Sequence, residues 1–221
     1  MKVFLCGGGA GLQTLEANKR LNEVVDHSKP CLYIPLAMEQ ENYAGCYEWI
    51  KDELKNVDVP YIEMVQSTDE LAAKDLNDFG VLFIGGGNTF KLLNNLKISG
   101  AFEKIKEYLN SEGVIFGGSA GAIIFGKDLE ACRLDDVNEV NLKEINGFNI
   151  LNGISILCHY TNQSVEKNEK NKQYLLELSK HKKIVALPEE ITLFINGEDI
   201  EVIGNGPYYF FENGAIIKRN V

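Results

Sequence analysis

Several features are scarce or missing in this chain of 221 residues, and their absence excludes whole classes of protein. The five cysteines form no C-x-x-C pair and are odd in number, which argues against a disulfide framework and favours a reducing compartment. No apolar run approaches the roughly 20 residues that a membrane-spanning helix needs. The N-terminus also lacks a basic segment followed by a long apolar run. We therefore expect a cytoplasmic protein that does not bind membranes.

Positive charge is also in short supply, since 22 lysines and arginines stand against 32 aspartates and glutamates, giving a formal net charge of −10. No basic stripe is present, so nucleic acid is not an expected partner. The chain has no Ser/Pro-rich linker, low-complexity tract or charge block that would divide it. We therefore expect one domain over residues 1–221. The composition leaves the oligomeric state open, with a homodimer as one option.

Short runs of Val, Ile, Leu and Phe alternate with longer amphipathic segments in the first half of the chain. This pattern is typical of parallel strands that are buried on both faces and joined by helices. Strands are expected at residues 2–6, 31–35, 60–65, 81–84 and 114–116. Helices are expected between them, including helices that begin after Ser67, after Asn88 or Thr89, and after Ser99.

The second half of the chain changes character beyond residue 135. A polar segment leads to an apolar run at 154–158, and a charged stretch at 166–172 leads into a further helix. Strands are then expected at 184–187, 191–195, 201–203, 208–211 and 215–218. The Asn-Gly and Gly-Asn-Gly segments at 196–197, 204–206 and 213–214 are hairpin signals. The expected fold is a three-layer α/β sandwich, with a mostly parallel central sheet flanked by helices and antiparallel strands towards the C-terminus.

Ser119 lies in the segment GGSAG at 117–121, between the apolar runs 113–116 and 122–125. This is the G-x-S-x-G pattern of a nucleophile elbow, a sharp strand-to-helix turn that lifts a serine hydroxyl clear of the sheet and needs small neighbours. Ser119 is therefore the expected nucleophile and the carrier of a covalent acyl-enzyme. The N–H group of Ala120, at the start of the following helix, is the expected first oxyanion donor.

Two glycine-rich turns follow predicted strands. The turn at 85–87 comes after the run 81–84, so the N–H group of Gly86 or Gly87 is the expected second oxyanion donor. This turn lacks the Lys-Ser/Thr of a P-loop. In the turn at 7–11, the third glycine of a dinucleotide fingerprint falls on Leu12. Close packing near the rim of the site explains this turn more simply than nucleotide binding does.

A serine nucleophile needs a base, and the chain has three histidines: His27, His159 and His181. His159 follows the predicted strand at 154–158, so it is expected at the sheet edge where ligands bind in open α/β sheets. The order nucleophile, acid, histidine places the third member between Ser119 and His159. The carboxylates available there are Asp135, Asp136, Glu139 and Glu144.

These segments together resemble the dipeptidase E (aspartyl dipeptidase) family of serine peptidases, relatives of cyanophycinase with a class I glutamine amidotransferase-like fold. The resemblance runs through most of the chain, and its most specific segments are GGGNTFKLL at 85–93, GSAGA at 118–122, GF at 147–148, HYTN at 159–162 and LPE at 187–189. It implies Ser119 as nucleophile, His159 as base and an oxyanion hole shared between the glycine turn and Ala120.

The resemblance also implies the triad acid, because Asn138-Glu139 matches the family's Asn-Asp pair and puts Glu139 first, ahead of Asp136 and Asp135. Glutamate here departs from dipeptidase E, whereas the cyanophycinase branch uses glutamate. The implied activity is hydrolysis of short peptides through a Ser-His-Glu/Asp triad, without a metal or another cofactor.

The family's typical substrate has an N-terminal aspartate, whose carboxylate needs a cation near the acyl site. The matching region at 165–173 offers Lys167, Lys170 and Lys172 but no arginine, so another N-terminal residue remains open. Asn88 and Thr89, beside the glycine turn, are the other expected substrate-binding residues. The alternatives are a hydrolase of isoaspartyl or cyanophycin-type bonds, a non-peptidase esterase, and an idle binding module of the same fold.

Overall fold

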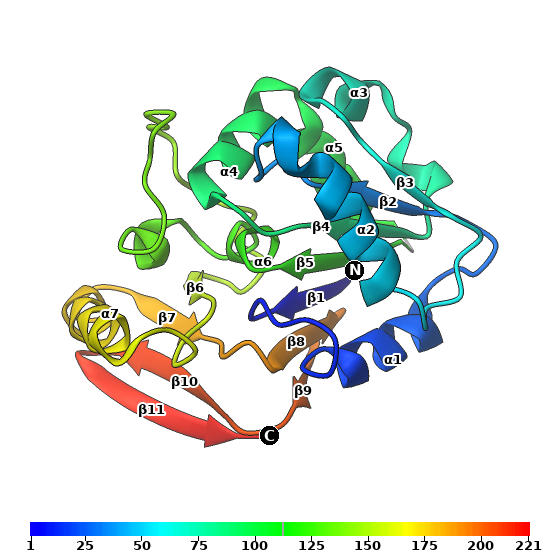
Figure 1. Cartoon of the computed structure of the whole chain (residues 1–221). Helices are drawn as coiled ribbons and strands as arrows, with labels where there is room; N and C mark the ends of the chain where they lie inside the picture. The colour runs from blue at the N-terminus through cyan, green and yellow to red at the C-terminus, as the bar shows by residue number, and fades with distance from the viewer. Residues whose placement is uncertain (112) are drawn as a thin grey trace.

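The computed structural model describes residues 1–111 and 113–221, in which the strands form two β-sheets (Figure 1). In spatial order, the larger sheet consists of β3 (Ile62–Met64), β2 (Cys31–Ile34), β4 (Val81–Ile84), β5 (Val114–Gly118), β1 (Lys2–Cys6), β8 (Ile191–Asn196) and β9 (Asp199–Gly204). The smaller sheet consists of β11 (Ala215–Asn220), β10 (Pro207–Glu212), β7 (Lys183–Ala186) and β6 (Ile154–Leu157).

The helices connect these strands. The α-helices of the described residues are α1 (Leu15–Val24), α2 (Tyr43–Glu53), α3 (Thr68–Ala73), α4 (Thr89–Ile98), α5 (Ala101–Leu109), α6 (Ala120–Ile123) and α7 (Val165–Leu178). Short 3-10 helices are η1 (Gln40–Asn42), η2 (Leu76–Asp78) and η3 (Glu130–Cys132). None of the helices in this part of the chain combines the length and the apolar character that crossing a bilayer requires.

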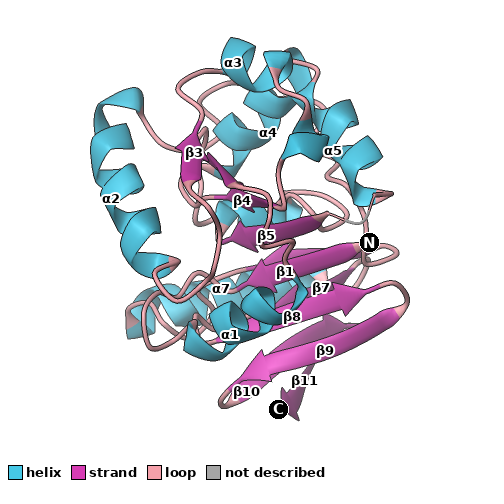
Figure 2. Ribbon diagram, turned by 90° about the vertical axis from the view of Figure 1, so that its right-hand side faces the viewer, coloured by secondary structure: helices cyan, strands magenta, loops and turns pink. Residues whose placement is uncertain are grey.

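The five strands from β3 to β1 are parallel. The side chains of β2 and β4, and most of those of β1 and β5, are buried on both faces of the sheet, whereas those of the edge strand β3 are half-buried. In β1, Val3 and Leu5 belong to the core that contains residues of α4 and α5, whereas Phe4 and Cys6 belong to the core with α1 and α2. Figure 2 shows the helices on the two sides of this sheet. Burial on both faces accounts for the continuous apolar runs, and the expected three-layer α/β fold is confirmed.

The local sequence signals for helix starts agree with the structure at two of the three positions considered. Ser67 and Asn88 are the N-caps of α3 and α4, and each side chain accepts a hydrogen bond from the backbone N–H three residues later. The helix expected after Ser99 begins at Ala101, with Gly100 as its N-cap in the left-handed region at φ 77°. Ser99 instead ends α4.

The C-terminal strands do not all join one sheet. The Asn-Gly signals at 196–197 and 213–214 form the β8–β9 and β10–β11 hairpins. The signal at 204–206 was wrong as a hairpin, because β9 lies in the larger sheet and β10 in the smaller one. A Cβ atom at Gly204 would lie 1.9 Å from the carbonyl oxygen of Glu190, so glycine there permits a close crossing between the sheets.

This second sheet positions part of the site. β6 and β7 are parallel neighbours, with Leu157 opposite Ala186, so the segments that follow the two strands emerge side by side. Both segments reach the turn that follows β1: the N–H of His159 donates to the carbonyl of Gly7 at 2.8 Å, and the N–H of Gly9 donates to the carbonyl of Glu189 at 3.1 Å. The ends of strands from both sheets therefore meet at one place.

Candidate active site

The elbow at Ser119 is a turn that only small residues can form. β5 ends at Gly118 and α6 begins at Ala120, while Ser119 itself has φ 53° and ψ −115°, a strained conformation for a residue with a side chain. A Cβ atom at Gly117 would lie 2.3 Å from the carbonyl oxygen of Gly121, and one at Gly121 would lie 2.0 Å from that of Ile84. The two glycines of the G-x-S-x-G pattern are therefore the positions that have no room for a side chain.

The glycine turn after β4 packs directly against the serine. A Cβ atom at Gly86 would lie 3.1 Å from the Cβ of Ser119. Within the described residues, the backbone N–H groups of Gly86, Gly87 and Ala120 have no backbone acceptor. These three N–H groups are the donors expected from the sequence. Each belongs to a residue that lies beside Ser119 or follows it in the chain, and each can still donate a hydrogen bond.

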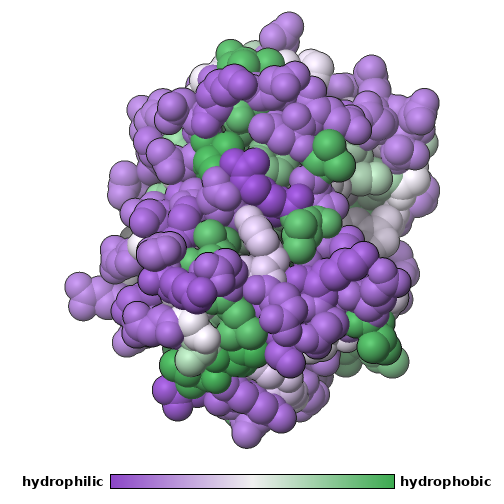
Figure 3. All heavy atoms as spheres, turned by 90° about the vertical axis from the view of Figure 1, so that its left-hand side faces the viewer, coloured by the Kyte–Doolittle hydropathy of each residue, from purple (hydrophilic) through white to green (hydrophobic). Residues whose placement is uncertain are grey.

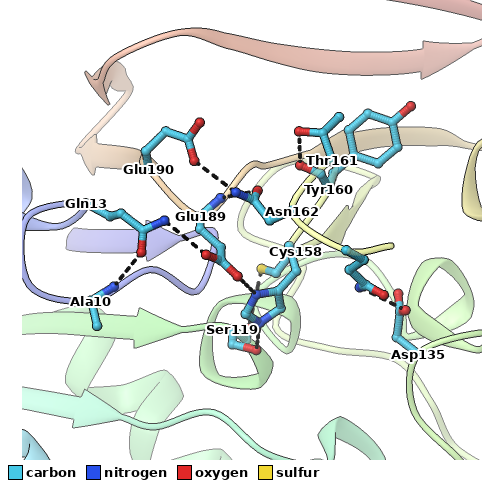
Figure 4. A network of polar contacts seen from close by, with 12 residues as sticks. Ala10, Gln13, Ser119, Asp135, Cys158, Tyr160, Thr161, Asn162, Glu189 and Glu190 are labelled. Atoms are coloured by element: carbon cyan, nitrogen blue, oxygen red, sulfur yellow. Dashed lines mark hydrogen bonds and ion pairs between the residues drawn. The ribbon is translucent and has the colours of Figure 1, made fainter. Parts of the chain in front are cut away.

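The side chains of Ser119, His159 and Glu189 form a continuous hydrogen-bonded line (Figure 4). Ser119 Oγ lies 2.8 Å from His159 Nε2, and His159 Nδ1 lies 2.9 Å from Glu189 Oε1. Because an ionised carboxylate only accepts hydrogen bonds, Nδ1 donates to Glu189, which leaves Nε2 of the neutral imidazole to accept the serine hydroxyl proton. This is the arrangement that a base needs to activate a nucleophile.

The carboxylate beside His159 differs from the one expected. Glu139, ranked first from the sequence, is exposed in the loop after η3, as is Glu144. Asp135 forms an ion pair with Lys167 at 2.9 Å, and Asp136 accepts hydrogen bonds from Thr89. Among the described residues it is Glu189 that contacts Nδ1, so the chain order is serine, histidine, acid.

A sequence signal for Glu189 was present. Glu189 stands in the LPE segment, just beyond the predicted strand at 184–187, as His159 stands just beyond the strand at 154–158. The pairing of β6 with β7 brings these two strand ends together. The order nucleophile, acid, histidine instead predicts an acid upstream of His159, and that prediction is wrong for the carboxylate that contacts Nδ1.

Two amide side chains hold Glu189 in place. Gln13 Nε2 donates to Glu189 Oε2 at 3.0 Å, and the side-chain oxygen of Gln13 accepts from the N–H of Ala10 at 3.4 Å. Asn162 Oδ1 accepts from the backbone N–H of Glu189 at 2.9 Å. Figure 4 shows Gln13 and Asn162 approaching Glu189 from different segments. One carboxylate oxygen is thus oriented by Gln13, which leaves the other for His159.

Cys158, next to His159, does not compete as a nucleophile. Its thiol is buried and lies 3.5 Å from the carbonyl oxygen of Ser119. Burial raises the pKa of the Cys158 thiol well above its usual value. The thiol therefore stays protonated, and only the thiolate form would be reactive.

The turn after β1 packs on the imidazole. Gly8 has φ 108°, and a Cβ atom there would lie 2.2 Å from Cε1 of His159. The close packing expected for the turn at 7–11 is therefore present, and its partner is the ring of His159. No side chain can occupy this position unless the ring moves.

Replacing Gly8 with alanine should lower kcat by about 100-fold, because a displacement of about 1 Å of a catalytic group costs that much. The matched control is Gly11→Ala, since Gly11 also has a positive φ of 62° but no atom within 4 Å of the added Cβ. Steady-state kinetics of both variants, with circular dichroism to check the fold, separate the clash from backbone strain. Equal losses in both variants would show that strain alone is responsible.

An acidic cavity of about 430 Å³ opens beside Ser119 and His159. Its charged lining residues are Asp135, Asp136, Lys167 and Glu189. Asp136 accepts hydrogen bonds from the N–H and the hydroxyl of Thr89, and burial is the main cause that raises the pKa of its carboxyl group. Figure 3 shows the face to which the carboxyl ends of the parallel strands point, and most of that surface is hydrophilic.

The other four residues expected to bind substrate differ from one another in their surroundings. Thr89 is fully buried beneath Asp136, and the Asn88 side chain caps α4 and donates to the carbonyl of Val137 at 2.8 Å. Both residues therefore support the loop that carries Asp136. Lys167 lines the acidic cavity, whereas Lys170 pairs with Glu166 on the exposed face of α7.

Comparisons with known proteins agree on one family. The model of "Peptidase family S51" matches residues 3–203. The chain is 27% identical to a peptidase E of Shewanella denitrificans over 84% of this chain and 79% of that protein. It is 28% identical to an uncharacterized peptidase of Listeria monocytogenes over 78% of this chain and 84% of the relative.

Solved structures show the same fold. The crystal structure of a candidate peptidase E protein from Listeria monocytogenes superposes with a TM-score of 0.72 at 24% identity, covering 93% of this chain and 98% of that one. The structure of a peptidase from an acI-B1 Actinobacterium gives a TM-score of 0.76 at 16% identity, covering 100% of this chain and 94% of that one. At these identities the likeness concerns the fold alone.

Proposed function

This chain belongs to peptidase family S51, a family of serine-type peptidases, and from that premise we propose that it is a serine exopeptidase that releases the N-terminal residue of short peptides. The observation that carries the proposal is the line of hydrogen bonds from Ser119 through His159 to Glu189. A hydroxyl, an imidazole and a carboxylate in this order are the parts of a catalytic triad.

In the proposed mechanism, Ser119 Oγ attacks the scissile carbonyl carbon while His159 Nε2 takes the hydroxyl proton. The N–H groups of Gly87 and Ala120 stabilise the oxyanion of the tetrahedral intermediate. His159 then protonates the leaving amine, and water hydrolyses the acyl-enzyme with His159 again acting as base. Glu189 holds the imidazole in the required tautomer and stabilises its charged form.

We propose that Asp136 binds the α-ammonium group of the substrate. In an N-terminal residue this group is two bonds from the scissile carbonyl carbon, so its binding partner must lie near Ser119. Asp136 lines the cavity beside Ser119, and the N–H and the hydroxyl of Thr89 both donate to its Oδ2 atom. An ammonium group would provide the partly buried carboxylate with the opposite charge that favours its ionised form.

The charges of this cavity favour an uncharged N-terminal side chain. Its one lysine among the described lining residues, Lys167, is already paired with Asp135 at 2.9 Å. Asp136 and Glu189 add two further carboxylates. The side chain of an N-terminal aspartate would have to compete with Asp135 for Lys167 in an acidic environment. The cavity therefore disfavours the N-terminal aspartate that is typical of the family's substrates.

The Asp136→Asn variant should raise KM about 10- to 100-fold for peptides with a free N-terminus and change kcat little, since a hydrogen bond to a charged group is lost. In the native protein, KM should also rise as the pH falls through the raised pKa of Asp136, because the protonated carboxyl no longer attracts an ammonium group. This dependence should be absent from the variant. Glu139→Gln, an exposed change in the same loop, is the control. Equal KM values for variant and native protein would exclude Asp136 as the binding group.

The function itself is tested with a panel of dipeptide amides X-Leu-NH₂, where X is Ala, Leu, Phe, Lys, Asp or β-linked Asp, together with N-acetylated Ala-Leu-NH₂. Turnover of the free peptides with uncharged X, and none of the acetylated one, is the expected result. Turnover of the acetylated peptide would exclude an exopeptidase. Turnover restricted to α-Asp or β-linked Asp would overturn the preference for an uncharged residue.

A further inference from the structure

A second cavity, of about 540 Å³, meets the acidic cavity at the catalytic residues. Both are lined by Gly87, Ser119 and His159, but their other lining residues come from different parts of the fold. The second cavity lies between α2, the turn after β1 and the ends of the central strands. Its volume falls in the range of about 300–1,000 Å³ that is typical of small-molecule sites.

One wall of this cavity is a single face of α2. Its lining residues from that segment are Asn42, Gly45, Cys46, Trp49 and Glu53. Their spacing of three or four places them on the same side of a helix. Trp49 keeps 39% of its surface exposed, which is unusual for a large aromatic side chain that contacts the core.

Three aromatic side chains of the central sheet also line this cavity. Tyr33, Phe83 and Phe116 line it from β2, β4 and β5. The ring centroids of Phe83 and Phe116 lie 4.7 Å apart, and Trp49 packs edge-on to Phe83 at 5.9 Å. We call this space, bounded by Tyr33, Trp49, Phe83 and Phe116, the aromatic cavity. Of these four side chains, Trp49 keeps 39% of its surface exposed, whereas the other three keep 3% or less. An apolar group that enters the cavity next to the nucleophile therefore removes mainly Trp49 surface from water.

The aromatic cavity carries a negative charge, on a carboxylate that already accepts hydrogen bonds. Among the described lining residues, Glu53 is the one Asp, Glu, Lys or Arg. Its carboxylate accepts hydrogen bonds from the N–H of Gly11 at 2.8 Å, from Asn18 Nδ2 at 2.7 Å, and from the hydroxyl of Thr14. Glu53 thus ties α2 to the turn after β1, and its negative charge opposes the entry of an acidic side chain.

We propose that the aromatic cavity binds the side chain of the residue that follows the scissile bond and selects a large apolar or aromatic residue there over a small or acidic one. This inference rests on the proposed exopeptidase function. If the acidic cavity holds the N-terminal residue by its α-ammonium group, the leaving residue must extend to the other side of Ser119, where the aromatic cavity begins.

Gly45 allows the cavity to be filled without disturbing the fold. It lies within α2 and lines the cavity, and a Cβ atom there meets no atom within 4 Å. Leucine at this position should extend into the cavity and should also favour the helix, because glycine is a poor helix former. Gly45→Ala is the matched control, since it gains the same backbone benefit and fills little of the space.

Binding can be measured without catalysis, because Trp49 is the chain's single tryptophan. Ser119→Ala protein is titrated with Ala-Phe-NH₂, Phe-Ala-NH₂, Ala-Ala-NH₂ and Ala-Glu-NH₂, and Trp49 fluorescence is recorded. Ala-Phe-NH₂ should bind about tenfold or more tightly than the other three, in line with burial of an aromatic side chain. Gly45→Leu should weaken its binding about tenfold and Gly45→Ala less than about twofold.

Tighter binding of Phe-Ala-NH₂ than of Ala-Phe-NH₂ would overturn the direction of binding, since the cavity would then hold the N-terminal residue. Equal binding of all four peptides, or equal effects of Gly45→Leu and Gly45→Ala, would overturn the selectivity. Because these titrations need no turnover, failure of the cavity assignment is distinguishable from failure of the proposed exopeptidase activity, which only the turnover panel reports.

Discussion

Replacing Ser119 with alanine is expected to lower kcat by about a million-fold, the loss seen when a serine peptidase loses its nucleophile. The reason is that the acyl-enzyme can no longer form, so hydrolysis would depend on direct attack by water beside the oxyanion donors. KM should change little, because the alanine removes no substrate-binding group. The measurement is the release of product from the best peptide of the panel by native and variant protein at high enzyme concentration.

A covalent probe provides the control for this variant. A small fluorophosphonate should add once to the native protein, visible as a single mass increment, and should not add to Ser119→Ala. The neutral, buried thiol of Cys158 should remain unmodified in both proteins. Retention of more than about 1% of the native kcat by the alanine variant, far above the residual rate such variants keep, would show that another group is the nucleophile.

Replacing Glu189 with glutamine should lower kcat by about ten-thousand-fold, as when the acid of a serine triad becomes an amide. The amide can donate a hydrogen bond to Nδ1, which would place the imidazole proton on Nε2 and leave the serine hydroxyl without an acceptor. Its uncharged group would also fail to stabilise the imidazolium that forms during attack. Steady-state kinetics over a range of pH measure the loss of kcat. This loss should be smaller at high pH, where hydroxide can take the serine proton in place of the imidazole.

Glu139→Gln is the decisive comparison, because Glu139 is the acid that the family resemblance implies. Glu139 is exposed in its loop, while Glu189 Oε1 lies 2.9 Å from His159 Nδ1. Glu139→Gln should therefore keep kcat within about twofold of native, as surface substitutions do. A large loss in Glu139→Gln with little change in Glu189→Gln would restore the acid implied by the sequence.

The sequence by itself determined the class of fold and the position of the elbow. Apolar runs such as 81–84 report burial on both faces of a strand, because this signal depends only on residues that are neighbours along the chain. The same is true of GGSAG at 117–121, whose tight turn requires glycine at Gly117 and Gly121. His159 is predicted as the base because, of the three histidines, it is the one that follows an apolar run.

Only the tertiary structure decided which carboxylate meets His159 and what surrounds the serine. Glu189 reaches the imidazole because β6 and β7 pair in a second sheet, a contact between segments some 30 residues apart that no local pattern encodes. The aromatic cavity likewise joins Trp49 of α2 to Phe83 and Phe116 of two strands. In the sequence, each of these side chains looks like an ordinary core residue. Its role in the cavity comes from its position in space relative to Ser119 and not from its residue type.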